Sequence, residues 1–409
     1  MNSNKIMEIF DQTAYVRTGG SPEELKTARY LLKQIQGFGV EASLEPFEVQ
    51  MGDIEQAELE IGGVSIPCEG YRCAGSAEVE APFYYLTGKD AYSLSQCRGK
   101  IVMVDGYLGY WVYQDLLKNG AVGFITYSGN ANYTDRDIDR RELRAMVHQG
   151  NKIPGVNINA KSAISLVKSR PKTAKIVLKQ REYVGKSHNV ILDLPGETED
   201  VILLSAHYDS TPLSVGTYDN MSGSVCLLAL AEYFSSHPHR SGLRFVWCGS
   251  EERGLLGSKA YCEIHEEELS KVVLNINLDM IGSIMGKFIC CATAEDALWQ
   301  YVDYMGCELG FGVEGYQGVY SSDSTPFADK GVPSMSLARD AAGNVATIHN
   351  RYDTVAVMSG PQMEDDIAFI RSFVERMANA RCCPVKREIP EKMKEELDYY
   401  LCRKRKAGK

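Results

Sequence analysis

Apolar positions recur along this chain with two different periods, and segments of one period alternate most regularly with segments of the other after residue 185. Short apolar runs, many of them β-branched, are typical of buried strands, whereas apolar residues spaced three or four apart indicate amphipathic helices. The predicted strands are 188–196, 200–209, 243–252, 272–282 and 332–338, and the predicted helices are 222–237, 254–265, 296–310 and 362–380. Continuous apolar strands that alternate with helices predict an α/β fold, with a mostly parallel mixed sheet flanked by helices on both faces.

The first half of the chain divides into two parts. Residues 4–38 read as helix, with Ser21 as an N-cap and Pro22 in the first turn, and a strand follows at 40–50. Between residues 50 and 184, strand-like runs alternate with one clear helix at 110–121, and no cluster of potential ligands is seen.

We therefore expect three parts along the chain. A discontinuous catalytic domain would comprise residues 1–49 and 185–380, and an accessory, β-rich inserted domain would comprise 50–184. The charged helical tail at 381–409 ends in a basic cluster, which we expect to be solvated.

Composition narrows the class of protein. The formal net charge of −10 argues against nucleic-acid binding, because little basic surface is left to neutralise phosphates. The sequence has no apolar run of about 18 residues that could span a membrane, and its first twenty residues contain no apolar core of a signal peptide. The 12 cysteines are scattered, without CxxC spacing. We expect a cytoplasmic protein that binds neither nucleic acid nor membranes.

Potential ligands follow several of the predicted strands. They are His207, Asp209, Asp219, Glu251, Glu252, Asp279 and His349. Because the carboxyl ends of parallel strands meet at one edge of a sheet, we expect these side chains to converge on one crevice. An unpaired carboxylate is costly to bury, so a cluster of this kind is typical of a cation or substrate site.

The residue types narrow the choice of metal. Two histidines with carboxylates and no thiolate suit Zn²⁺, Mn²⁺ or Co²⁺. The ligands suffice for two ions roughly 3.5–4 Å apart, provided that one carboxylate bridges them. Of the adjacent pair Glu251 and Glu252, one can bind metal while the other acts as a general base.

The motifs together resemble the M28 family of co-catalytic zinc peptidases. The resemblance covers roughly residues 187–378 and rests on "AHYDS", "YDNMSG", "GSEERGLLGSKAY", "NLDMIG", "SSDSTPFADKGVPS" and "IHNRYDT". The segment "RTGGSPEELKTARYLLKQIQGFG" also looks like the helix that precedes the catalytic core in that family. Within the predicted insert, "GKIVMVDG" and "KNGAVGFITYS" resemble the protease-associated (PA) domain that many of these enzymes carry.

The resemblance implies a role for each ligand. One zinc ion would be held by His207, Asp219 and Asp279, and the other by Asp219, Glu252 and His349, so that Asp219 bridges the two ions. Asp209 would orient His207, and Glu251 would be the general base.

One position departs from the family pattern. Family members commonly carry a phenol immediately before the last histidine, where this chain has Ile348. Tyr320 or Tyr352 could replace it as a substrate-binding group.

The expected function is that of an aminopeptidase, which releases N-terminal residues from peptide substrates. A carboxypeptidase or dipeptidase on the same scaffold stays possible, because Arg339 could bind a substrate carboxylate. A glutaminyl-cyclase-like transferase and a non-catalytic binding protein are further alternatives.

Overall fold

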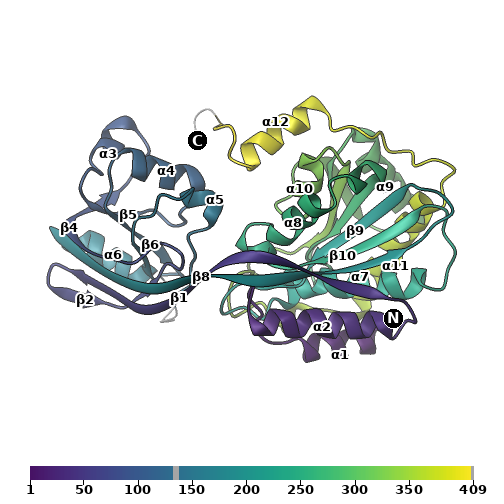
Figure 1. Cartoon of the computed structure of the whole chain (residues 1–409), viewed down its shortest axis with the longest axis horizontal. Helices are drawn as coiled ribbons and strands as arrows, with labels where there is room; N and C mark the ends of the chain where they lie inside the picture. Colours follow the sequence, from purple (N-terminus) through teal and green to yellow (C-terminus); the bar gives the residue numbers. More distant parts are fainter. Residues whose placement is uncertain (132–137, 407–409) are drawn as a thin grey trace. The chain divides into compact units, whose positions relative to one another are not determined.

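The computed structural model describes residues 1–131 and 138–406, which form two compact units (Figure 1). One unit consists of Met1–Glu48 and Lys186–Lys409, and the other of Val49–Gly185. Parts of the predicted insert (132–137) and of the predicted tail (407–409) lie outside the described residues. Among the helices that are described, none is both long and apolar enough to cross a membrane.

The first unit contains a sheet with strand order β13–β12–β14–β11–β9–β10–β8. The strands are β8 (Thr173–Leu194), β9 (Val201–His207), β10 (Gly242–Cys248), β11 (Val272–Leu278), β12 (Lys287–Thr293), β13 (Val313–Gln317) and β14 (Ser334–Asp340). The central strands β10, β9, β11 and β14 are parallel, whereas β8 and β12 pair antiparallel with β10 and β14. The predicted mostly parallel mixed sheet is confirmed.

Helices cover both faces of this sheet. The helices α1 (Ser3–Gln12), α2 (Pro22–Gln36), α7 (Ser222–Phe234), α9 (Asp296–Leu309) and α11 (Gly360–Ala378) share one large apolar core. The helices α8 (Leu256–Ile264) and α10 (Ser324–Asp329) contribute to a second core. In β9, Ile202 and Leu204 belong to the first core and Leu203 to the second. The strand is therefore apolar on both faces, as its uninterrupted apolar run indicates.

Two helices replace the single helix expected over residues 4–38. The first, α1, ends at Gln12, and α2 begins after Ser21, whose side chain accepts a hydrogen bond from the main chain of Glu24 at 3.1 Å. The predicted N-cap and Pro22 in the first turn are confirmed. The segment between the helices brings Arg17 against the loop that follows β9.

The second unit has the strand order β8–β4–β5–β6–β7–β3, and β1 pairs with β2 and β8. Its strands are β1 (Ala42–Ile61), β2 (Val64–Ile66), β3 (Cys68–Gly70), β4 (Ala77–Leu86), β5 (Ile101–Val104), β6 (Gly123–Ser128) and β7 (Gly155–Asn159). Its helices are α3 (Ala91–Ser95), α4 (Tyr110–Lys118), α5 (Ala145–His148) and α6 (Ala160–Ser169). The resemblance of this unit to a PA domain stays a prediction.

The C-terminal helix α12 (Glu391–Tyr400) is packed against the first unit rather than solvated on all sides. Met393 and Leu397 are buried in an apolar cluster with Ala328 of α10. In the basic segment that follows, Arg403 forms ion pairs with Asp329 and Asp398. The side chains of residues 403–406 are exposed, so the basic segment is solvated as expected, although nearby carboxylates pair with part of its charge.

Candidate metal centre

Each predicted ligand lies at the carboxyl end of a strand in the first unit or in the connection that follows it. His207 is the last residue of β9, and Asp279 directly follows β11. Asp219 lies in a short π-helical turn (η1, Thr217–Met221) that leads into α7. Glu251 and Glu252 begin a 3₁₀ turn (η2, Glu251–Arg253) after β10. His349 lies in the segment between β14 and α11. Four connections, those after β9, β10, β11 and β14, therefore bring residues distant in sequence to one sheet edge.

Two groups of potential ligands share Asp219. The first is His207, Asp219 and Asp279, and the second is Asp219, Glu252 and His349; within each group the ligand atoms lie within 4.8 Å of one another. Asp219 Oδ1 lies 3.2 Å from His207 Nε2, and Asp219 Oδ2 lies 3.1 Å from His349 Nε2. Each group is thus faced by a different oxygen of Asp219, which is the arrangement expected of a bridging carboxylate.

The remaining ligands complete the two groups. Asp279 Oδ1 lies 3.7 Å from His207 Nε2, and Glu252 Oε2 lies 3.1 Å from His349 Nε2. His349 is the most open ligand, with a side chain 46% exposed, whereas the side chain of His207 is 1% exposed. The second group therefore faces solvent, while the first is enclosed.

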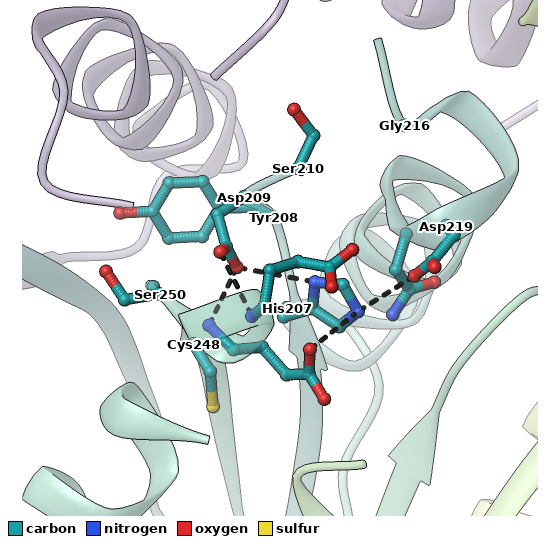
Figure 2. Close-up of polar contacts among 12 residues, drawn as sticks. His207, Tyr208, Asp209, Ser210, Gly216, Asp219, Cys248 and Ser250 are labelled. Atoms are coloured by element: carbon teal, nitrogen blue, oxygen red, sulfur yellow. Dashed lines mark hydrogen bonds and ion pairs between the residues drawn. The ribbon is translucent and has the colours of Figure 1, made fainter. Parts of the chain in front are cut away.

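Asp209 contacts both the imidazole of His207 and the loop that carries the two glutamates (Figure 2). Its Oδ1 lies 3.4 Å from His207 Nδ1 and accepts the main-chain N–H of Glu251 at 2.9 Å. Its Oδ2 accepts the N–H of Glu252 at 3.2 Å. A carboxylate on the far nitrogen of an imidazole leaves Nε2 free to bind a metal and makes it more basic.

The site holds an excess of buried negative charge. Burial alone would lower the pKa of His207, but Glu251, Asp209 and other nearby carboxylates outweigh it and hold that pKa well above its ordinary value. Burial raises the pKa of Glu251 well above its ordinary value, and the carboxylates around it add to the effect. Such a cluster needs a cation to compensate it.

The donor set fits divalent metal ions of the borderline class. Two imidazoles and three carboxylates supply nitrogen and oxygen ligands without a thiolate. Asp279 Oδ1 is buried and has no hydrogen-bond donor among the described residues, although it points toward His207 Nε2. A bound cation in the first group would satisfy this oxygen.

Arg339 is not available to bind a substrate carboxylate. Its Nε and Nη2 donate to the carboxylate of Asp366, and its Nη1 donates to the carbonyl of Gly286 at 3.0 Å. The guanidinium also lies over the rings of Phe288 and Phe311. All its nitrogens are thus engaged within the fold, which removes the feature that favoured a carboxypeptidase.

The two candidate tyrosines, and Ile348 in place of the usual phenol, differ in their surroundings. Burial raises the pKa of Tyr320 above its ordinary value, and the charges of Asp279 and Asp219 add to the effect. Tyr352 is 59% exposed and lies beside the guanidinium of Arg351. Ile348 is on the surface.

Sequence reasoning missed three buried charged residues that hold the ligand loops. They are Arg17, Glu24 and Asp353. Glu24 accepts hydrogen bonds from the main chain of Ser250 at 3.0 Å and from the hydroxyl of Ser187 at 2.7 Å. The only signal was that these residues stand within the "RTGGSPEE" and "IHNRYDT" segments, because charged residues in polar segments usually indicate surface.

Comparisons with known proteins agree with this geometry. The model of peptidase family M28 matches residues 189–373, which include all seven predicted catalytic and ligand residues. The aminopeptidase YwaD of Bacillus subtilis is 27% identical over 78% of this chain and 71% of its own length. The probable lipoprotein aminopeptidase LpqL of Mycobacterium tuberculosis is 25% identical, and the alignment covers 68% of this chain but only 58% of that protein.

A solved structure with the same fold is that of BSAP, a zinc aminopeptidase from Bacillus subtilis. It superposes with a TM-score of 0.77 at 23% identity and covers 96% of this chain and 98% of that one. The matching family model and the paired ligand groups lead to one conclusion: residues 189–373 of this chain form a domain of peptidase family M28.

Proposed function

We propose that this protein is an aminopeptidase that uses two zinc ions to release N-terminal residues from peptides. The observation that carries the proposal is the position of Asp219, which turns one oxygen toward each histidine. The domain of family M28 supports the peptidase activity, and the aminopeptidase relatives YwaD and LpqL support the N-terminal direction.

The ligand groups define where the ions would lie. His207 and Asp279 would hold one ion and Glu252 and His349 the other, with Asp219 shared. When bound, the two ions polarise the scissile carbonyl and lower the pKa of the attacking water. BSAP, which shares the fold, is a zinc aminopeptidase, and the nitrogen and oxygen donors of this chain suit the same metal.

Glu251 is the proposed general base. It belongs to neither ligand group, yet its Oε2 lies 3.9 Å from His207 Nε2 and its side chain is only 11% exposed. It would take the proton of the attacking water and pass it to the leaving amine. Asp209 would hold both His207 and the main chain of Glu251 in place, and Tyr320 would contact the substrate.

Cleavage of a defined peptide mixture tests the proposal. Peptides with free N-termini and the same peptides with acetylated N-termini are incubated with the protein and followed by mass spectrometry, with and without a chelator. Stepwise loss of N-terminal residues from the free peptides alone, stopped by the chelator and restored by zinc, is the expected result. Release from the C-terminus would contradict it and favour a carboxypeptidase. Cyclisation of N-terminal glutamine without hydrolysis would favour a transferase.

The proposed compartment is the cytoplasm. None of the twelve cysteines, all of which lie within the described residues, forms a disulfide, and most are buried. Cysteines that are this numerous and not joined in disulfides are typical of a reducing environment. Localisation of the full chain by cell fractionation tests this proposal.

A further inference from the structure

The loop that carries Asp219 is held by two buried charges from distant parts of the chain. This loop, residues 208–221, connects the end of β9 to α7 and contains no strand. Arg17, from the segment between α1 and α2, binds its main-chain carbonyls, and Asp353, from the segment after His349, binds its main-chain N–H groups. Neither residue belongs to a ligand group.

Arg17 joins the beginning of the loop to its end. Its side chain is wholly buried, and the guanidinium donates to the carbonyls of Tyr208 and Val215, and to that of Gly216 at 2.6 Å. The main-chain N–H of Arg17 also donates to the hydroxyl of Ser210 at 3.1 Å. A planar guanidinium can serve several acceptors at fixed angles, which a lysine ammonium on a flexible stem cannot.

Asp353 binds the main chain at the bridging residue itself. Its Oδ1 accepts the N–H of Tyr218 at 2.8 Å, and its Oδ2 accepts the N–H of Asp219 at 3.0 Å. Because Asp353 lies four residues after His349, this contact also ties the loop of the outer histidine to the bridging carboxylate. The two hydrogen bonds leave the side chain of Asp219 free to face both ligand groups.

The two charges also complement each other. Burial lowers the pKa of Arg17 to about 10, and the charge of Asp353 is the largest of those that oppose this shift. Arg17 is therefore still a cation at neutral pH, and it lies among carboxylates without taking a ligand oxygen of Asp219. It stabilises the loop by its charge as well as by its hydrogen bonds.

We propose that Arg17 and Asp353 are positioning residues that set the bridging carboxylate. They fix the main chain before and at Asp219, so that one carboxylate oxygen is presented to each metal ion. This inference rests on the proposed two-metal function. Outer partners of metal ligands typically change metal affinity by about 10- to 100-fold when replaced, and here one ligand serves both ions.

Gly216 provides an independent way to disturb the same loop. It has a φ of +52°, and a Cβ added there would lie 2.5 Å from the carbonyl oxygen of Asp219 and 2.8 Å from the Cβ of Ser210. Gly216→Ala therefore forces the loop to shift without removing a charge or a hydrogen-bonding side chain. We expect it to weaken zinc binding in the same way.

Zinc affinity of the full-length protein tests the inference, measured by competition with a chromophoric chelator of known affinity. Asp353→Asn keeps the size of the side chain but places an amide N–H₂ against a main-chain N–H. We expect this variant to bind zinc about 10- to 100-fold more weakly, with Arg17→Lys and Gly216→Ala shifted in the same direction. Circular dichroism before the titration confirms that each variant is folded.

Asp366→Asn is the matched control. Asp366 is as fully buried as Asp353, also accepts a main-chain N–H, that of Gly282 at 3.0 Å, and pairs with Arg339. We expect its zinc affinity to stay within about twofold of wild type even where its stability falls. A weakening equal to that of Asp353→Asn would overturn the inference, since any buried carboxylate would then do the same.

The possible failures are distinguishable. A wild-type protein that binds no zinc would refute the proposed function and the inference with it. The positioning role alone is refuted by a different outcome. In that outcome the wild-type protein binds two zinc ions, and Gly216→Ala and either charge variant are folded and bind zinc equally tightly. Should Asp353→Asn not fold, Arg17→Lys and Gly216→Ala decide the question.

Discussion

Replacing Glu251 with glutamine separates proton transfer from metal binding. The change keeps the shape of the side chain, removes its charge, and leaves the hydrogen bond from its main-chain N–H to Asp209 Oδ1 (2.9 Å) untouched. Glu251 Oε2 lies 3.9 Å from His207 Nε2, farther than the ligand oxygens of Asp219 and Asp279. We therefore expect both metal ions to stay bound in this variant.

The expected loss of rate follows from the role of a general base. Such a base contributes a factor of about 10²–10⁴, which corresponds to about 2.7–5.4 kcal/mol of transition-state stabilisation. The assay compares kcat/KM of wild type and Glu251→Gln on a chromogenic amino-acid anilide. Zinc content of the same preparations is measured by inductively coupled plasma mass spectrometry.

The neighbouring residue supplies a matched control. Glu252→Gln is the same chemical change one position later, but Glu252 Oε2 lies 3.1 Å from His349 Nε2 within a ligand group. This variant is expected to lose activity together with one metal ion. The role of Glu251 as base is refuted if Glu251→Gln keeps a rate within about tenfold of wild type, well short of the loss expected of a base, or if it loses zinc as Glu252→Gln does.

Further predictions follow from the same geometry. Asp219→Asn is expected to weaken both sites, so its zinc content should fall below that of His349→Ala, which loses ligation at one site only; metal analysis at matched free zinc compares them. Chelation should lower Tm in differential scanning calorimetry, since free zinc at about 1,000 times Kd adds roughly 4 kcal/mol per site. An unchanged Tm would contradict the metal centre. Arg339→Met should leave Asp366 buried and unpaired and lower the free energy of unfolding by about 3–5 kcal/mol. Its cleavage direction should stay N-terminal, like that of wild type. If wild type instead releases C-terminal residues and the variant loses that release, Arg339 binds the substrate carboxylate.

The ligand cluster could be predicted because it depends on chain topology. Parallel strands place their carboxyl ends at one edge, so His207 at the end of β9 and Asp279 after β11 must lie near each other once both strands are recognised. Apolar runs identify such strands without knowledge of their neighbours. The sheet and the convergence of the ligands could therefore be predicted from the sequence.

The ion pairs and hydrogen bonds between distant side chains could not be predicted from the sequence. Arg339 looks like a free cation in the sequence, but tertiary packing places it against Asp366 on α11. Arg17 and Asp353 stand in polar segments that read as surface loops, and only the folded chain shows that both are buried. Contacts between residues so far apart in the chain leave no periodic pattern in the sequence.

Two features of the secondary structure were not predicted, helix α6 and the break between α1 and α2. Helix α6 begins after Asn159, whose side chain caps it, and buries Ala160, Ala163 and Leu166. The helix starts directly after β7 (Gly155–Asn159), so its first apolar residues continue the apolar run of that strand. The break between α1 and α2 was missed although Thr13 ends the first helix and Ser21 begins the second.

The proposed function depends above all on one carboxylate, that of Asp219, being shared by two zinc ions. Anomalous diffraction from crystals of the zinc-loaded protein, at wavelengths on either side of the zinc edge, tests this sharing most directly. We predict two peaks per chain, about 3.5–4 Å apart, one beside His207 and one beside His349, with Asp219 between them. A single peak, or two peaks without Asp219 in contact with both, would contradict the shared ligand.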